Sequence, residues 1–150
     1  MKIRFLLLAV AWIAADFSSA IAADWPQWRG PQRNGISDER GLLKQWPADG
    51  PKLIWQAKDI GDGYSTPSVV GDRLYVMSNR GMDDEFVQAL DTKDGQQIWS
   101  VRVGNVGPNT ALQYPAARST PTIDGPLLFA LGSDGGVVVG WVVTGSVTRR

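Results

Sequence analysis

The chain has 150 residues, with 15 basic and 15 acidic side chains, and it contains neither histidine nor cysteine. A formal net charge of zero gives no positive cluster for nucleic acid, whose binding depends on many lysine and arginine contacts to phosphates. The missing residue types exclude a Ser-His-Asp triad, a cysteine nucleophile, disulfides and zinc sites of the usual His/Cys kind. The 17 glycines, 9 prolines and 7 tryptophans predict a β-rich chain of short segments divided by turns.

The N-terminus predicts a signal peptide over residues 1–22. Two positive charges precede an apolar run from Phe5 to Ala15, which is too short to cross a bilayer core of about 30 Å. The small residues Ala20 and Ala22 then favour cleavage after Ala22. We therefore expect an exported chain, periplasmic or extracellular, without a membrane anchor after cleavage. The alternative is an uncleaved N-terminal anchor.

The mature chain divides into a leader and a strand-rich part. Residues 23–50 predict an irregular leader rich in tryptophan, proline and glycine, because no period of about 2 or 3.6 lasts for a full element. From Pro51 onward, short β-branched and aromatic runs alternate with turn dipeptides, which predicts strands joined by hairpins. The predicted strands are Leu53–Lys58, Ser65–Val70, Arg73–Asn79, Glu85–Asp91, Gln97–Val103, Ser119–Asp124, Leu127–Gly132 and Gly136–Val143. The acidic stretch 81–85 is interpreted as a solvated hairpin tip, with a calcium loop as the alternative.

The strand-rich part contains an internal repeat. The segment STPSVVGDRLYV, which begins at Ser65, aligns without a gap with STPTIDGPLLFA, which begins at Ser119, 54 positions later. An Ile-Trp pair ending at Trp55 returns at Trp99, 44 positions later. About four short strands per unit at this period predict the blades of a β-propeller. The alternative is a β-sandwich with chance similarity between its parts.

The repeat gives a first unit at residues 51–104, an inter-unit loop at 105–117 and a partial second unit at 118–150. Beyond Gly140 the second unit lacks the aspartate, turn and tryptophan pattern of the first. Its C-terminal tail is therefore interpreted as aberrant, the product of a frameshift or a premature stop. Propellers use about four to eight blades, so we expect an incomplete propeller of about two blades.

One turn in the first unit has a mechanical interpretation. In the segment ALDTKDGQQIW, Asp91 is expected to accept hydrogen bonds from the turn backbone, and Gly95 to supply the positive φ that closes the hairpin. The tryptophan that ends the segment then points from the outermost strand toward the neighbouring unit. The structural repeat residues are thus Ala89, Asp91, Gly95, Trp99 and Trp55.

The same segment resembles the tryptophan-docking motif of quinoprotein, or PQQ-like, propeller repeats, written A-x-D-x-x-T-G-x-x-x-W, with Asp94 in place of the usual Thr. The leader and the two S-T-P starts also resemble secreted PQQ-like repeat proteins of planctomycete-type bacteria. The resemblance covers most of residues 24–136. It implies an all-β fold of antiparallel four-stranded blades of a PQQ-like β-propeller, related to the propeller of the outer-membrane assembly machinery.

The resemblance implies two classes of function. Some relatives are dehydrogenases that bind pyrroloquinoline quinone (PQQ) and calcium on the propeller axis, and others are non-enzymatic assembly propellers. This chain has no recognisable cofactor segment, so we expect no catalytic, cofactor-binding or metal residue in it. The leading hypothesis is an exported, non-catalytic fragment of an interaction scaffold, with a protein partner or the missing blades of the same propeller bound to it. The alternative is the N-terminal part of a PQQ-dependent dehydrogenase, with PQQ and calcium as its cofactors.

Other candidate residues are interpreted as structural. Arg73, Arg102 and Trp141 have the chemistry to contact an anionic, planar quinone, but surface charge and blade packing are the favoured roles. The hydroxyls of Ser65 and Ser119 have no base in any recognisable motif, so neither is expected to be a nucleophile.

Overall fold

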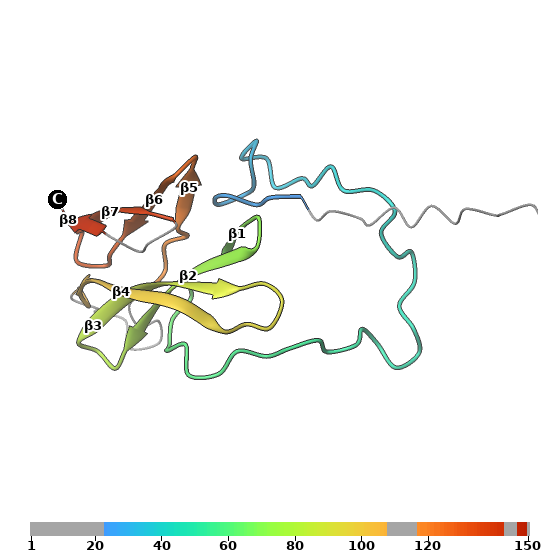
Figure 1. Cartoon of the computed structure of the whole chain (residues 1–150), viewed down its shortest axis with the longest axis horizontal. Helices are drawn as coiled ribbons and strands as arrows, with labels where there is room; N and C mark the ends of the chain where they lie inside the picture. Colours follow the sequence, from blue (N-terminus) through green and yellow to red (C-terminus); the bar gives the residue numbers. More distant parts are fainter. Residues whose placement is uncertain (1–22, 108–116, 143–146, 150) are drawn as a thin grey trace, which may run out of the picture.

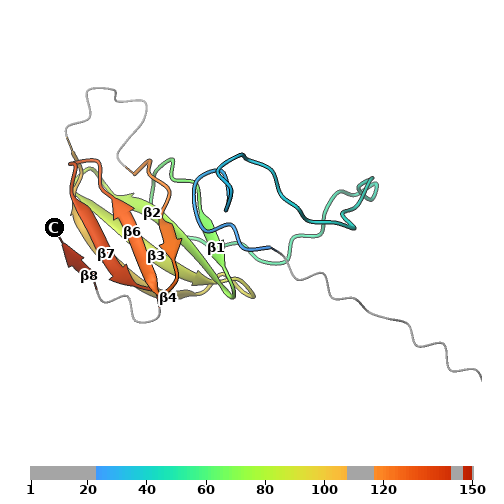
Figure 2. The same ribbon diagram turned by 90° about the horizontal axis from the view of Figure 1, so that it is seen from above.

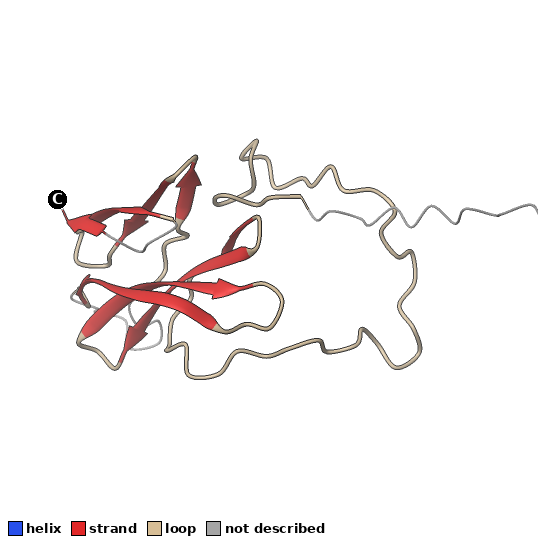
Figure 3. Cartoon of the chain, viewed as in Figure 1, coloured by secondary structure: helices blue, strands red, loops and turns tan. Residues whose placement is uncertain are grey.

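The computed structural model of the chain describes residues 23–107, 117–142 and 147–149. These residues form two four-stranded antiparallel sheets, and Figure 3 shows no helix among them. The fold class is therefore all-β, as the sequence predicts. Within these ranges no helix has the length and apolar character needed to cross a membrane. The predicted signal peptide lies outside the described residues.

Both sheets are simple meanders in which consecutive strands are neighbours (Figure 1). The first sheet contains β1 (Ser68–Val70), β2 (Arg73–Arg80), β3 (Asp84–Asp91) and β4 (Gln97–Asn105). The second sheet contains β5 (Thr122–Asp124), β6 (Leu127–Leu131), β7 (Val137–Trp141) and β8 (Val147–Arg149). The first sheet thus lies within residues 68–105 and the second within residues 122–149.

The strand register repeats from one sheet to the other. Arg73 pairs with Asp91 in the first sheet, and Leu127 pairs with Trp141 in the second. The first members of these pairs are 54 positions apart (127 minus 73), but the second members are only 50 apart (141 minus 91). The hairpin of the second and third strands is therefore longer by four residues in the first sheet. Its two strands have eight residues each where those of the second sheet have five, although its turn, residues 81–83, is shorter than the turn at residues 132–136. We call residues related in this way counterparts.

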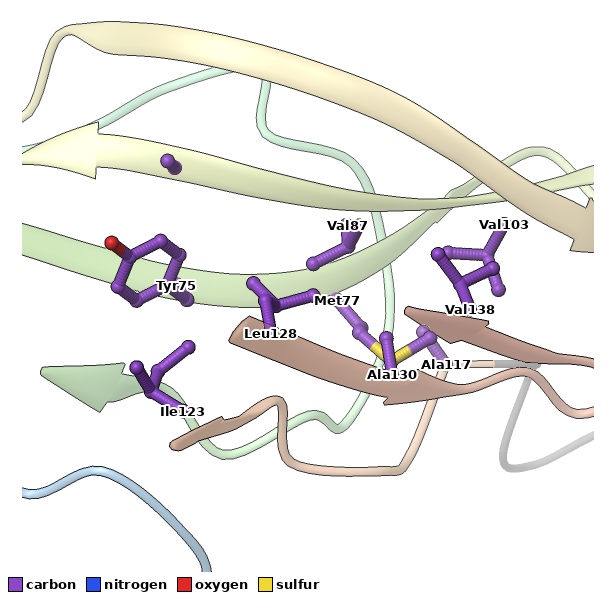
Figure 4. Close-up of a cluster of buried hydrophobic side chains, with 10 residues drawn as sticks. Tyr75, Met77, Val87, Val103, Ala117, Ile123, Leu128, Ala130 and Val138 are labelled. Atoms are coloured by element: carbon purple, nitrogen blue, oxygen red, sulfur yellow. The ribbon is translucent and has the colours of Figure 1, made fainter. Parts of the chain in front are cut away.

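The core lies between the two sheets, which stack face to face (Figures 2 and 4). One face of the first sheet supplies Tyr75, Met77, Val87 and Ala89, and we call it the Tyr75 face. The facing side of the second sheet, the Leu128 face, supplies Ile123, Leu128, Ala130 and Val138. All eight are buried in one cluster, together with Val103 and Ala117. Burial of this shared apolar layer is the main stabilising contribution in the fold, since each sheet alone would leave it in water.

The predicted strand Leu53–Lys58 is wrong as a paired strand, because none of these residues joins a sheet. The side chains of Leu53 and Ile54 are 73% and 74% exposed. The β-rich composition of the segment is not sufficient, because a strand needs a neighbouring strand to satisfy its backbone groups.

The first strand of each unit is shorter than the sequence predicts. The predicted strands begin at Ser65 and Ser119, but pairing in β1 and β5 begins only after Pro67 and Pro121. A proline has no backbone N–H to donate to a ladder, so it delays the start of pairing.

The second sheet has its fourth strand, which the sequence did not predict. β8 pairs with β7 through Val147, Thr148 and Arg149, in the tail that we expected to be aberrant. Residues 143–146, which connect β7 to β8, lie outside the described residues. The second unit therefore has the same strand order as the first.

Residues 23–50 contain no helix and no strand, but the first of them hold the two sheets together at their first strands. Trp25 exchanges two backbone hydrogen bonds with Val69 of β1, at 2.7 and 3.0 Å. The next residue, Pro26, accepts a bond of 2.8 Å from the backbone N–H of Ile123 in β5. Further along, residues 36–52 extend away from both sheets (Figures 1 and 2).

The buried phenol of Tyr75 predicts a pH dependence of stability. Burial raises the pKa of this group above its ordinary value of 10.0, although the nearby Arg73 guanidinium opposes the shift. A raised pKa in the folded state means that the stabilising contribution is complete below the unfolded pKa and is lost as the pH rises through the folded value. We expect Tyr75→Phe to lose less stability than the wild type as the pH rises above about 10.

Denaturant unfolding at a series of pH values measures this effect. Tyr64→Phe is the matched control, because its ring is 55% exposed. Equal alkaline losses of stability in the wild type and in Tyr75→Phe would show that the buried phenol does not titrate with unfolding.

Candidate functional site: two tryptophan docking sites

Two tryptophans cross from one part of the chain to the next in the same way. The indole Nε1 of Trp55 donates a hydrogen bond of 2.8 Å to the backbone carbonyl of Thr92. The indole Nε1 of Trp99 donates one of 3.3 Å to the backbone carbonyl of Val142. Thr92 and Val142 are counterparts, 50 positions apart, and each follows the last residue of the third strand of its sheet. We call these the first and second docking sites.

The backbone at the two docking sites is arranged alike. The N–H of Thr92 donates to the carbonyl of Asp72 at 3.0 Å, and the N–H of Val142 donates to the carbonyl of Pro126 at the same distance. Asp72 and Pro126 are counterparts in the first hairpin turn of each sheet. The carbonyl that receives the indole is thus held in place by the same hairpin in both units.

The first docking site is built by the turn after β3. Asp91 Oδ1 accepts a bond of 2.8 Å from the N–H of Lys93, and the carbonyl of Asp91 accepts one of 2.9 Å from Gly95. Gly95 has a φ of +72°, and the ring of Trp55 lies against it. A Cβ at this position would stand 2.5 Å from Trp55 Cε3, so the glycine serves both the turn and the seat of the indole.

The second docking site lies beside the inter-sheet core. Trp99, on β4, packs against that core, and its ring centroid is 6.0 Å from that of Tyr75. Ala89, which is fully buried, is directly opposite Trp99 in the sheet. Arg73 adds a bond of 2.5 Å from its guanidinium to the carbonyl of Val142, which therefore accepts from two side chains. Trp99 joins the outer strand of one sheet to the next sheet.

The polar candidates from the sequence do not form one site. In the strand register, Arg73 lies opposite Asp91 at one end of the first sheet, and Arg102 lies opposite Phe86 toward the other end. The side chain of Arg102 forms an ion pair with Asp84 at 2.6 Å. Arg73 bonds to the carbonyl of Val142 in the second unit and Arg102 to Asp84 in the first sheet, so the two guanidinium groups do not meet at one place. Trp141 is 54% exposed on the far side of the second sheet.

The serine candidates are hydrogen-bonded to the backbone. Ser65 Oγ donates to the carbonyl of Ser119 at 2.8 Å and accepts from the N–H of Met77 at 3.1 Å. Ser119 Oγ donates to the carbonyl of Leu131. Ser65 thus connects the first unit to the second, while Ser119 is bonded within the second unit.

The acidic stretch 81–85 does not gather its carboxylates around one point. Asp84 is paired with Arg102, while Glu85 is fully buried and accepts a bond of 2.6 Å from the N–H of Ser133. No group of three potential metal ligands occurs among the residues that the structure describes. The interpretation as a solvated tip is wrong for Glu85, whose side chain links the two sheets.

The sequence located Trp55, Trp99 and the turn at Gly95, but not the carbonyl that receives Trp99. Val142 has no motif of its own, and the spacing from each tryptophan to its acceptor differs, 37 residues in one case and 43 in the other. The repeat offset falls from 54 at the second strand to 50 at the third, and that change would have identified Val142, which lies 50 positions after Thr92. The inter-sheet role of Glu85 had no signal in the sequence.

Stacked four-stranded meanders joined by docked tryptophans are the architecture of PQQ-like propeller repeats. Residues 32–149 match the family model described as outer membrane protein assembly factor BamB. The chain belongs to this PQQ-like repeat family. No curated protein matches the chain.

The second docking site predicts that Trp99 is important for stability. Trp99→Ala removes an aromatic side chain from the edge of the inter-sheet core, and we expect it to lower the free energy of unfolding by about 3–5 kcal/mol. Denaturant unfolding measures the change. Trp46→Ala is the control, since its side chain is 64% exposed and a loss within about 0.5 kcal/mol is expected. Identical transitions for Trp99→Ala and the wild type would exclude the docking role.

The first docking site predicts that Gly95 is sensitive to a single methyl group. Gly95→Ala adds a Cβ that meets both the positive φ and the Trp55 ring, so we expect a loss of more than about 1 kcal/mol. Gly71→Ala is the matched control, because Gly71 also has a positive φ, of +59°, but nothing within 4 Å of the added Cβ. The comparison separates backbone strain from the contact with Trp55, and equal losses in the two variants would argue against a seat for the indole.

Proposed function

We propose that the protein is an exported, non-catalytic PQQ-like repeat scaffold that binds another protein. The observation that carries the proposal is the family match over residues 32–149, because the family description names an outer membrane assembly factor. Assembly in that compartment requires export, which agrees with the predicted signal peptide at residues 1–22. The docking sites support a structural use of the repeat, since their tryptophans bind backbone carbonyls of the chain itself.

The leader supports a protein partner. Large apolar side chains along it are exposed, from 60% to 71%: Trp28, Ile36, Leu42, Leu43 and Trp46. Exposed large apolar side chains in this number favour a protein–protein contact site, since the energetic centres of such sites are enriched in tryptophan. The segment that carries most of them extends away from the sheets, where a partner can reach it (Figure 1).

The rival function is oxidation of an alcohol or aldose by bound PQQ and calcium. A quinone of this type needs cations and a stacking plane that converge from several sheets. Arg73 and Arg102 are the strongest cationic candidates, but Arg73 is hydrogen-bonded to Val142 of the second unit and Arg102 is ion-paired with Asp84 of the first sheet. This geometry favours the scaffold over the dehydrogenase.

One experiment separates the two functions. The full chain is expressed in a bacterium, and the periplasmic product, whose mass should show the loss of residues 1–22, is mixed with PQQ and calcium. We expect no quinone-dependent oxidation of alcohols or aldoses in a dye-linked assay. Turnover that requires added PQQ would overturn the scaffold proposal and support the dehydrogenase.

The same product tests the partner surface. Cross-linking of envelope proteins to the leader should fall in Trp46→Ser and should persist in Lys44→Ala, a neighbouring change of charge. Equal cross-linking by both variants would exclude the apolar side of the leader as the contact surface.

A further inference from the structure

The second sheet has an uncovered face that is covered in the first sheet. The Tyr75 face includes Met77, Val87 and Ala89, and all four side chains are at most 2% exposed. Their counterparts in the second sheet are Phe129, Leu131, Val137 and Val139, and we call this side, which also carries Trp141, the Phe129 face. Leu131 is 51% exposed, Val137 39% and Trp141 54%. Among the residues that the structure describes, the same apolar surface is thus covered in the first sheet and largely exposed in the second.

The chain also has a strand that lacks a sheet. Residues 53–58 carry Trp55, which is docked on the first sheet as Trp99 of β4 is docked on the second. The positions 44 residues later, 97–102, form most of β4. Residues 53–58 therefore occupy the place of the outer strand of a sheet that would precede the first one. Their exposed Leu53 and Ile54 have no neighbouring strand.

The exposed Phe129 face and the unpaired residues 53–58 lie where a further sheet would pack on each side of the chain. Within the chain, the Tyr75 face of one sheet packs on the Leu128 face of the next. The counterpart of the Leu128 face in the first sheet contains Val69, Leu74, Val76 and Gln88, and we call it the Leu74 face. Val69 and Leu74 on it are half-buried, whereas Val76 and Gln88 are buried, and Gln88 is bonded to the carbonyl of Ile60. A chain cannot bring its own Leu74 face onto its own Phe129 face, because both sheets lie between them (Figure 2).

We propose that the chain assembles head to tail with a second copy of itself, with the Phe129 face of one copy on the Leu74 face of the next. Residues 53–58 of the next copy then lie along the outer edge of β7. They replace β8, which has three residues where β4 has nine. Such a contact joins two different surfaces, so it continues from copy to copy until a ring closes. The net charge of zero on the full chain gives no overall repulsion against this assembly. This inference goes beyond the proposed function, because self-assembly does not depend on another protein.

The register between β3 and β4 of the first sheet predicts which residues of two copies lie opposite each other. Val87 of β3 is opposite Val101 of β4. Val137 is the counterpart of Val87, 50 positions later, and Ala57 corresponds to Val101, 44 positions earlier. The pairing of Val87 with Val101 therefore places Val137 of one copy opposite Ala57 of the next. Ala57 belongs to the segment that docks on the first sheet through Trp55, whereas Val137 lies on β7 of the second sheet, so this contact is one between two copies.

Disulfide trapping tests this register, and the chain is suited to it because it contains no cysteine. Ala57→Cys and Val137→Cys are combined in the full chain, which is then oxidised and separated on a non-reducing gel. We expect a ladder of dimers and larger species that collapses to one band on reduction. The matched control combines Lys58→Cys with Val137→Cys, whose side chains would point to opposite sides of the paired strands, and should give no ladder. An oxidised Ala57→Cys/Val137→Cys variant that stays monomeric, or that matches the control, overturns the proposal.

Sedimentation of the wild-type chain provides a second test that needs no cysteine. We expect species larger than one copy, and a shift to a single copy in Val139→Glu, which places a charge on the Phe129 face. Unchanged tryptophan fluorescence would show that this variant keeps its docked indoles. A wild-type chain that sediments as one copy at every concentration overturns self-assembly and leaves the Phe129 face to a different protein.

Discussion

The fold depends on the contact between unlike faces of successive sheets. A four-stranded meander is a single layer, and when both of its faces are apolar it cannot bury them by itself. Here the Tyr75 face of the first sheet and the Leu128 face of the second bury each other in one cluster. The docked indole of Trp99 then bonds to the carbonyl of Val142, which fixes how far the outer strand of one sheet reaches across the next. Apolar burial supplies the stabilisation, and the indole hydrogen bond supplies the orientation.

Buried polar groups add specificity to this contact. Glu85 accepts from the backbone of Ser133, and Gln88 donates to Ser78 Oγ at 2.5 Å and to the carbonyl of Ile60 at 2.6 Å. The first bond ties the second sheet to the first, and the last ties the segment after Trp55 to the Leu74 face. Because an apolar layer can slide with little penalty but a buried hydrogen bond cannot be lost cheaply, these few bonds select one arrangement of the sheets.

Much of this architecture could be predicted from the sequence, because the repeat consists of short contiguous segments that can be aligned with each other. The offset of 54 between Ser65 and Ser119 holds through the first hairpin of each sheet, so the strand order of both units follows from it. The offset then falls to 50 at the third strand, and no local pattern marks that change. The acceptor Val142 and the short strand β8 were therefore missed.

At residues 53–58 the sequence predicts a strand that the structure does not pair. Their composition is that of a strand, and the segment even shares its Ile-Trp pair with β4, but its partner strands are not among the described residues. Local propensity states what a segment can become, while pairing depends on a tertiary neighbour. The bridging role of Trp25 was hidden for the same reason, since one residue with two backbone bonds to Val69 leaves no periodic pattern.

The way the side chains are bonded also bears on what kind of function this repeat can carry. A ligand site needs polar groups that are still free to turn toward a ligand, and here Arg73 is bonded to Val142 and Arg102 to Asp84. The surfaces that remain open are instead apolar: the leader around Trp46 and the Phe129 face around Trp141. Surfaces of this composition gain free energy by excluding water against another protein surface, without the convergent charges that a small anionic ligand requires. The same property that lets one sheet stack on the next therefore favours macromolecular contacts wherever the stack is left uncovered.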